Sequence, residues 1–290
     1  MSVQGKRGHI YKLATLLNYL LLTILALIFA LPIIYLLVSS LKPGWQIVRD
    51  TSSIRAFLPV GELSFGNYEQ AFRQAPVAHF LFNSVLITTL TVTASLFVNS
   101  IAAFAISRLR WKGQFFILSI IVAAIIIPFE AVAIPLLLIV NNLPWISQGG
   151  ISFGWLNSYH VQIFPFIADA YIIYLFVQYF KQLPNDLFEI ARIEGASWFQ
   201  IFWWIVMPLS GPVYATAAIM RLLVMWNQYL WPTLVVQTDK YRPIMVGFGY
   251  FYAGGPGMAY LTIATLPVLI IFFLFQRAFI ASITEMNYSG

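Results

Sequence analysis

The sequence contains no cysteine and very little charge. Lys, Arg, Asp and Glu together make up 9% of its 290 residues, and there are 3 histidines. A soluble globular domain carries about 25% charged residues, so this chain cannot cover a water-facing surface of ordinary composition. The absence of cysteine excludes disulfides, thiolate metal sites and cysteine nucleophiles, and we expect no metal site. The low content of charged residues also excludes soluble enzymes, nucleic-acid-binding domains and disordered proteins.

Hydrophobic residues are abundant instead. They make up 60% of the sequence, and the mean hydropathy is +0.82, which predicts an all-α integral membrane protein. A bilayer core about 30 Å thick needs roughly 20 apolar residues in a helix. The first hydrophobic stretch is too long for a signal peptide and lacks a small-residue cleavage site, so we expect it to be retained. The predicted transmembrane helices cover residues 16–41, 79–106, 115–140, 160–180, 209–232 and 259–279.

Basic residues flank these helices unevenly. The richer side holds the N-terminal tail, the short loop after residue 106 and the loop after residue 180, so the positive-inside rule predicts cytoplasmic termini in a prokaryotic plasma membrane. These flanking basic residues account for the net charge of +6, so we expect no nucleic-acid partner. We expect three parts: residues 1–77 with the tail, first helix and external loop, residues 78–280 with a five-helix core, and residues 281–290 as a cytoplasmic tail.

The loop at residues 183–208, between the fourth and fifth predicted helices, has a helical pattern of its own. Pro184 ends the preceding helix, and Asp186 is the predicted N-cap of a new one. Gly195 permits a left-handed turn, and Ser197 can cap a second short helix. The pattern predicts a helix–turn–helix on the cytoplasmic side. An interfacial amphipathic helix that only anchors the loop is the alternative.

The same loop resembles the EAA signature of importer permeases of the ATP-binding cassette (ABC) class. Ile190 and Met207 depart from that signature, which usually has alanine and leucine there. The matching residues are Glu189, Ala191, Gly195, Ile205 and Pro208.

The resemblance implies a type I ABC importer permease fold. In that family the loop, here including Asp186 and Ala196, is a coupling helix that docks on cytoplasmic ATPase subunits. The implied partners are two such subunits, which bind ATP and Mg²⁺, a second homologous permease subunit that gives a heterodimer, and an external solute-binding protein. The chain itself has no G-x-x-x-x-G-K-[ST] loop, so we expect it to bind no cofactor and to perform no catalysis.

Shorter segments resemble the carbohydrate-uptake branch of this family. They imply the smaller of two permease subunits for an oligosaccharide or a related polyol. A permease for glycerol-3-phosphate, a polyamine or an amino acid is the alternative, and a secondary transporter would need internal repeats that are not apparent. The segments are residues 82–84, residues 102–109 with Gly113, Trp226 and Asn227 with Leu230 and Pro232, and residues 276–277 with Phe279.

Ionisable residues within the predicted spans require partners, because a bilayer does not solvate charge. Asp169 and Arg221 lie near mid-depth in the fourth and fifth helices, so we predict an interhelical ion pair, with a role in the substrate path as the alternative. Glu130 lies between Pro128 and Pro135, which can unwind the helix locally. Its carboxylate either accepts hydrogen bonds from sugar hydroxyls or is solvated at the outer interface.

Further candidates for the substrate path are polar or aromatic residues in or near the spans. For the asparagines the alternative is a helix-to-helix hydrogen bond, and for the Trp-Asn pair it is an aromatic belt. These candidates are Asn83, Asn99, Trp226 and Asn227. A glycine-rich segment before the last helix is predicted to touch the solute-binding protein, or else to be an ordinary mobile connection. Its residues are Tyr252, Gly254, Gly255 and Pro256.

Overall fold

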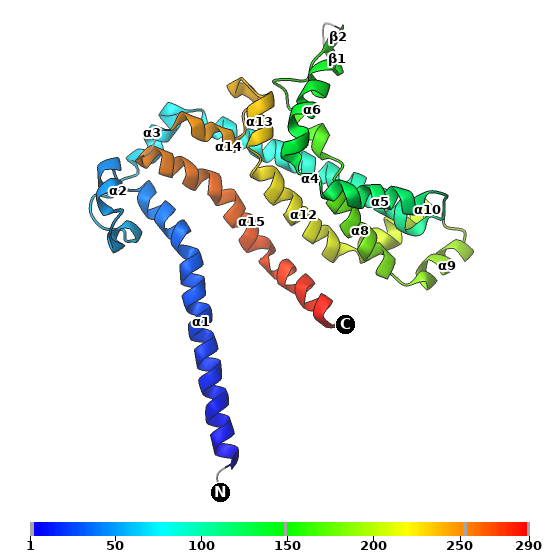
Figure 1. Cartoon of the computed structure of the whole chain (residues 1–290), viewed down its shortest axis with the longest axis horizontal. Coiled ribbons are helices and arrows are strands. Elements are labelled where there is room, and N and C mark those ends of the chain that lie inside the picture. Colours follow the sequence, from blue (N-terminus) through cyan, green and yellow to red (C-terminus); the bar gives the residue numbers. More distant parts are fainter. Residues whose placement is uncertain (1–2, 148–149, 252–253, 289–290) are drawn as a thin grey trace. The chain divides into compact units, whose positions relative to one another are not determined.

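The computed structural model describes residues 3–147, 150–251 and 254–288, with side chains for 15–145, 151–251 and 254–273. Helices dominate these residues, as Figure 1 shows. The chain divides into two compact units, one formed by Met1–Ala75 with Phe248–Thr265 and one formed by Pro76–Gly247 with Leu266–Gly290. The first division lies close to the boundary expected at residue 77, but the start of the last helix joins the first unit.

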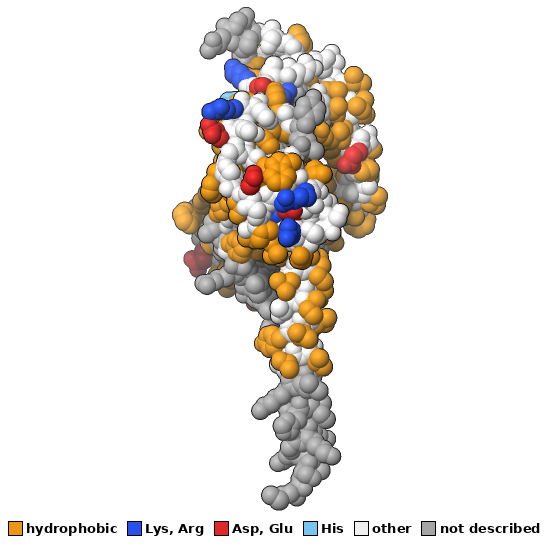
Figure 2. Space-filling view, turned by 90° about the vertical axis from the view of Figure 1, so that its left-hand side faces the viewer, with side chains coloured by type: hydrophobic (Ala, Val, Ile, Leu, Met, Phe, Trp, Pro, Cys, Tyr) orange, Lys and Arg blue, Asp and Glu red, His pale blue; other side chains and the backbone are white. Residues whose placement is uncertain are grey.

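The first unit begins with a long helix, α1 (Val3–Ser40). Thr15–Ser40 is long and apolar enough to cross a membrane, and its most apolar window has no buried residue. Figure 2 shows hydrophobic side chains around this part of the helix, as expected for a surface that faces lipid. The unit also contains α2 (Gly44–Asp50), η1 (Ile54–Phe57), α3 (Gly66–Gln74), η5 (Phe248–Tyr250) and the first residues of α15 (Gly255–Tyr288).

A buried polar network holds the segment after α1 together. The ammonium of Lys42 lies 3.2 Å from Asp50 Oδ2 and donates to the carbonyl oxygen of Arg55 at 2.6 Å. Gln46 donates to the carbonyl oxygen of Val60 at 2.6 Å and accepts from the amide of Glu62 at 2.9 Å. Every charge that leaves water here has a partner, which is the condition under which buried charges are tolerated.

The second unit is a helical bundle built around α4 (Val77–Arg108), which packs against α8 (Ala170–Gln182) and α12 (Gly211–Trp226). Its apolar core includes Phe104, Phe176, Phe180 and Phe202. The other elements between α4 and α8 are α5 (Gln114–Ile125), α6 (Phe129–Asn142), α7 (His160–Ile163) and η2 (Phe164–Phe166). After α8 come α9 (Asn185–Ile193), α10 (Trp198–Ile201), the π-helical turn η3 (Phe202–Val206), α11 (Met207–Leu209), α13 (Leu230–Val235), η4 (Asp239–Tyr241) and α14 (Ile244–Gly247).

Two of the candidate spans are pairs of helices with a sharp bend between them. The axis turns by 105° between α5 and α6, where Pro128 is the N-cap of α6, and by 79° between Trp198–Leu209 and α12. Proline restricts the residue before it and lacks an amide hydrogen, so a helix breaks readily there. The described residues contain four helical segments long and apolar enough to cross a membrane, and six spans when each bent pair counts as one. The helical membrane fold with six spans agrees with the sequence prediction.

The structure also adds an element that the sequence analysis did not predict. Strands β1 (Pro144–Ser147) and β2 (Gly150–Phe153) form an antiparallel hairpin in which Trp145 pairs with Ser152. The ring of Trp145 stacks on that of His160, with centroids 3.8 Å apart, so the hairpin is fixed to the start of α7.

Candidate functional site

The loop at residues 183–208 forms the predicted helix–turn–helix, but its first helix begins two residues earlier than expected. Pro184 is the N-cap of α9, and no side chain caps this end. The prediction that Asp186 caps the helix is therefore wrong, because Asp186 already lies inside the first turn. Its negative charge is still favourable beside the positive end of the helix dipole. Figure 1 shows α9 and α10 beside the C-terminal end of α4, away from the hairpin.

Gly195 ends α9 through a complete Schellman motif. Its φ is +87°, in the left-handed region that glycine adopts without a steric penalty. The amide of Ala196 donates to the carbonyl of Ala191 at 2.9 Å, and the amide of Gly195 donates to that of Arg192 at 3.1 Å. The turn between the two helices is thus determined by backbone bonds within the loop itself.

Ser197 starts the second helix as predicted. Its hydroxyl accepts from the amide of Gln200, and the Gln200 side chain accepts from the amide of Ser197 at 2.8 Å, which is a reciprocal capping box. After α10 the chain makes the π-helical turn Phe202–Val206 just before Pro208. Proline has no amide hydrogen to donate within an α-helix. A π turn shifts the hydrogen-bonding register of the helix next to this proline.

The two faces of α9 differ in character. Phe188 is buried, and Leu187 and Ala191 pack against the core of the second unit. Ile190 and Ile193 point away from the core and are 60% and 83% exposed. The helical pattern of this segment includes Leu187, Ile190, Ala191 and Ile193, and the structure divides these residues between an anchoring face and a free face.

Other residues of the EAA resemblance also divide between these roles. Ala196 and Ile205 are half-buried and pack against the core, so they support the loop. Pro208 is exposed, and a Cβ at Gly195 would meet no atom within 4 Å. The tip formed by Ile190, Ile193 and Gly195 is therefore open to a partner.

Glu189 is exposed beside a groove of about 930 Å³ between α9 and the end of α4. Arg108, Arg110 and Arg192 also line this groove. Among the described residues the Glu189 carboxylate forms no ion pair, although these guanidinium groups surround the groove. It remains available to a group outside this chain.

The predicted ion pair between Asp169 and Arg221 is present. Asp169 Oδ2 lies 2.8 Å from Arg221 Nη1, and Arg221 also donates to the carbonyl oxygen of Phe166. Asp169 serves a second purpose as the N-cap of α8, because Oδ1 accepts from the amide of Ile172 at 2.9 Å. The pair joins the start of α8 to the middle of α12.

The candidate asparagines of the substrate path make bonds within the protein. Asn83 donates to the carbonyl oxygens of Lys240 and Arg242, and its own oxygen accepts from the Tyr159 hydroxyl at 2.8 Å. Asn99 donates to the carbonyl oxygen of Ile167 at 3.0 Å, and its oxygen accepts from the amide of Asp169. These contacts favour the helix-to-helix alternative for both residues.

The remaining path candidates lie in different environments. Trp226 is buried at the end of α12, whereas Asn227 is exposed and donates back to the carbonyl oxygen of Leu223 at 2.8 Å. Glu130 is exposed in the first turn of α6, directly after the bend that Pro128 marks. Of these residues, only Glu130 and Asn227 present polar side chains at the surface.

The glycine-rich segment predicted to touch a binding protein is packed in part. Gly255 is buried, and a Cβ there would overlap the side-chain amide of Asn67, which itself donates to the carbonyls of Ser40 and Lys42. Gly255 is therefore a close-packing residue and not a contact surface, which corrects the prediction for this position. Gly254 and Pro256 are half-buried, and Tyr252 lies outside the described residues.

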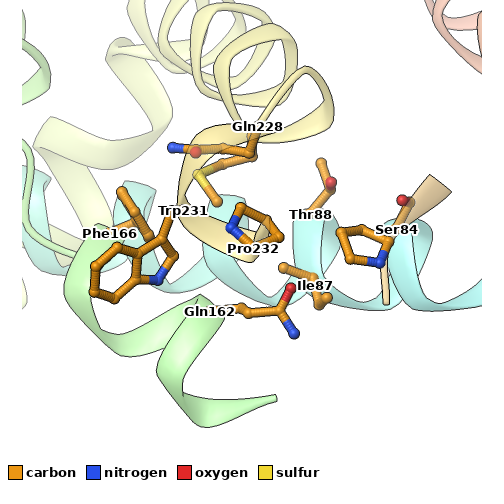
Figure 3. A pocket seen from close by; sticks show the side chains of 10 residues that line it. Ser84, Ile87, Thr88, Gln162, Phe166, Gln228, Trp231 and Pro232 are labelled. Carbon is orange, nitrogen blue, oxygen red and sulfur yellow. The ribbon is translucent and has the colours of Figure 1, made fainter. Parts of the chain in front are cut away.

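Sequence reasoning missed a small polar cavity in the second unit, shown in Figure 3. Its volume is about 10 Å³, enough for one water molecule. Gln162 is buried, and its Oε1 has no hydrogen-bond partner, although Nε2 donates to the carbonyl oxygens of Ser158 and Tyr241. Ser84, Thr88, Gln228 and Trp231 also line the cavity. The spacing of Ser84 and Thr88, four residues apart on one helix face, was the available signal.

Comparisons with known proteins agree with this architecture. The lactose transport system permease protein LacG of Rhizobium radiobacter is 28% identical over 93% of this chain and 94% of its own length. The arabinooligosaccharides transport system permease protein AraQ of Bacillus subtilis is 29% identical over 97% of each chain. The crystal structure of a bacterial ABC transporter that imports the acidic polysaccharide alginate has a chain with the same fold. That chain matches with a TM-score of 0.73 and 22% identity over 92% of this chain and 96% of its own.

A family model covers most of the bundle and the loop described above. It is described as "binding-protein-dependent transport system inner membrane component", and it matches residues 95–285. This match spans more than half of the chain and includes the whole segment that resembles the EAA signature. The chain therefore belongs to the family of inner membrane components of binding-protein-dependent transport systems.

Proposed function

We propose that this permease subunit carries a di- or oligosaccharide, or a related polyol, across a prokaryotic plasma membrane. Separate ATPase subunits drive the transport and dock on residues 183–208. The observation that carries the proposal is the helix–turn–helix at Asn185–Ile201, which is rigid by its own hydrogen bonds and ends in an exposed apolar tip. As a permease component the chain is not an enzyme, so the energy for transport has to enter through such a contact.

The proposed solute class rests on relatives that cover nearly the full chain. The names of LacG and AraQ specify lactose and arabinooligosaccharides. The exposed polar groups of Glu130 and Asn227 suit hydrogen bonds to sugar hydroxyls, because carboxylates accept and amides both donate and accept. In this proposal these two residues line part of the path, while Asn83 and Asn99 support it.

The proposed complex has further subunits. A second homologous permease subunit forms a heterodimer with this chain, and an external solute-binding protein delivers the solute. Two ATPase subunits bind ATP and Mg²⁺. The termini and the loop at 183–208 face the cytoplasm, while α2, α3 and the hairpin lie outside. The basic residues at Arg108, Arg110, Lys112, Lys181 and Arg192 support this orientation by the positive-inside rule.

In such a complex, ATP acts on the permease through the position of α9. Closure of the ATPase subunits pulls on the two loops that dock on them, and the bundles above rotate as rigid bodies. The exposed tip at Ile190, Ile193 and Gly195 is the proposed contact, and the buried face at Leu187, Phe188 and Ala191 transmits the force.

Site-specific crosslinking tests the proposed docking. The chain has no cysteine, so Ile193→Cys carries the only thiol-reactive crosslinker in this subunit. We expect Ile193→Cys to trap an ATP-hydrolysing subunit in the complex purified from its native membrane. Ile151→Cys, which is 73% exposed on the hairpin, is the matched control and should trap none. Equal trapping at both positions, or none at Ile193, would contradict the proposal.

Transport measurements test the solute class. The purified complex in vesicles, with its solute-binding protein outside and ATP inside, should accumulate a labelled di- or oligosaccharide. Glycerol-3-phosphate, a polyamine and an amino acid are the comparison solutes. Uptake of one of these, without sugar uptake, would reject the carbohydrate assignment and leave the ATP-driven permease intact.

A further inference from the structure

The last residue of α4, Arg108, makes an unusual number of contacts with other elements. Its Nε donates to the carbonyl oxygen of Phe180 at 2.9 Å, and Nη2 donates to the same oxygen and to that of Leu183 at 2.6 Å. Its Nη1 donates to Asn185 Oδ1 at 2.7 Å. Four of the five guanidinium N–H groups are therefore accounted for by groups on two neighbouring helices.

These acceptors lie where two helices meet. Phe180 and Leu183 are at the C-terminal end of α8, where a cation is favourable because carbonyl groups point outward. Asn185 is the first residue of α9. The guanidinium carbon also lies 4.2 Å from the ring centroid of Phe188, the buried aromatic residue of α9. One side chain of α4 thus contacts the end of α8 and both the start and the anchoring face of α9.

The base of Arg108 is itself fixed. The indole of Trp111 donates to the carbonyl oxygen of Ala105 at 3.0 Å, and Gln114 donates to that of Ile106. These bonds satisfy carbonyl groups that the end of α4 leaves without helical partners. One turn earlier, the rings of Phe104 and Phe202 pack 5.4 Å apart. Movement of this end of α4 therefore carries the Arg108 side chain with it.

We infer that Arg108 is a positioning residue that makes α9 move together with the ends of α4 and α8. The inference rests on the proposed function, in which α9 receives force from an ATPase subunit. Without Arg108, the covalent link at Pro184 and apolar contacts would hold α9. Apolar contacts have no direction and allow a helix to rotate or slide. Lysine cannot replace arginine here, because an ammonium lacks the planar fork that reaches three acceptors at once.

Neighbouring arginines do not share this arrangement. Arg192 donates to the carbonyl oxygen of Ala196 at 2.9 Å and stays within the loop, and Arg110 is exposed. Arg110→Gln is thus a matched control for Arg108→Gln, with the same change of charge two residues away. Asn185→Ala removes one of the four Arg108 bonds from an exposed position, so it leaves the core of the bundle intact.

The first experiment measures the position of α9 in the permease. Spin labels at Lys112→Cys and Ile193→Cys, both exposed, report the distance between the end of α4 and the tip of α9 by pulsed electron resonance. We expect one narrow distribution in the parent chain and in Arg110→Gln. We expect a broader or shifted distribution in Arg108→Gln and Arg108→Lys, and a smaller change in Asn185→Ala. Unchanged distributions in all Arg108 variants would overturn the inference, whatever the partners of the subunit are.

The second experiment measures coupling in the complete complex in vesicles. The complex that contains Arg108→Gln should still hydrolyse ATP through its ATPase subunits. It should transport about tenfold less solute per ATP, the factor expected for lost hydrogen bonds to a charged group. Asn185→Ala should lose less, and Arg110→Gln should match the parent. Equal solute transported per ATP in all variants would overturn the inference. Failure of the parent chain to bind any ATPase subunit would overturn the proposed function instead.

Discussion

Asp169 and Arg221 form the ion pair that joins α8 to α12, with Oδ2 and Nη1 2.8 Å apart. The pair is part of a larger network, because the amide of Asp169 donates to Asn99 of α4 at 3.0 Å. Arg221 is 4% exposed, whereas Asp169 is 29% exposed. The three central helices of the second unit therefore meet at one polar point, and Arg221 is the more deeply buried of its two charges.

This difference predicts unequal effects of removing either charge. Asp169→Asn keeps an oxygen for the α8 cap but leaves the buried Arg221 without a counter-charge. We expect it to lower the free energy of unfolding by about 3 kcal/mol, typical of breaking a buried pair. Arg221→Met leaves the less buried Asp169 carboxylate, which still accepts from the amide of Ile172, so its cost should be smaller.

Thermal unfolding of the purified subunit in detergent measures both variants. The double variant Asp169→Asn/Arg221→Met should be more stable than Asp169→Asn alone, because it leaves no unpaired buried charge. Additive losses in the double variant would show that the two side chains do not interact energetically.

At Gly195, asparagine should destabilise the protein less than alanine does, but either substitution should reduce solute transport. Alanine in the left-handed conformation costs about 1 kcal/mol, and asparagine costs less. Either side chain would project from the open tip and hinder close approach by an ATPase subunit. We expect Gly195→Asn to unfold at nearly the parent temperature yet transport less solute. Full transport by Gly195→Asn would limit Gly195 to a role in the turn.

The segment between α1 and α3 should loosen in acid. Burial raises the pKa of the Asp50 carboxyl, but hydrogen bonds from Lys42, Arg49 and Gln46 outweigh this effect and leave the pKa below its usual value. A lowered pKa in the folded state adds stability above the unfolded value of about 4, and this stability is lost as the pH falls further. The hydrogen-exchange protection of residues 43–60, measured relative to the intrinsic rate at each pH, should therefore fall below about pH 4.

The variant Asp50→Asn provides the control for this acid effect. It has no carboxyl to protonate, so the protection of the same segment should depend less on pH between about 2 and 5. If the protection of this segment depends on pH in the same way in the parent chain and in Asp50→Asn, another group governs the acid effect.

The cavity beside Gln162 should hold one ordered water molecule. Its volume of about 10 Å³ and the unpartnered Gln162 Oε1 meet the size and polarity that a buried water needs. An experimental structure that shows solvent should place a water about 3 Å from this oxygen. Thr88→Val removes one lining hydroxyl and should lower stability by about 1 kcal/mol, whereas Thr88→Ser should not. An empty cavity in the parent chain would contradict the prediction.

The features that could be predicted from sequence are those with local or compositional causes. Hydrophobic length predicts the spans, and Pro128 marks the sharper bend because proline acts on its immediate neighbours. The turn at Gly195 and the cap at Ser197 depend on residues within a few positions of each other. Even the Asp169–Arg221 pair followed from two charges at the same depth, with few alternative partners in the bilayer.

The features that were missed depend on contacts between distant segments. The side chain of Asn185, at the start of α9, accepts from Arg108, 77 residues away, and no local rule reveals that bond. Gln162 lines a cavity with residues of α4 and α13, so its unpartnered oxygen appears only when these helices are assembled. Gly255 looked like part of a flexible contact loop, but Asn67 packs against it from elsewhere in the first unit.

The Schellman turn and the capping box within residues 191–200 have one further consequence for the energetics of assembly. A segment that is already ordered before it meets another molecule loses little conformational entropy on binding. The loop should therefore associate with its partner without first having to fold, so more of the contact energy is retained as affinity. A disordered loop of the same composition would spend part of that energy on its own ordering.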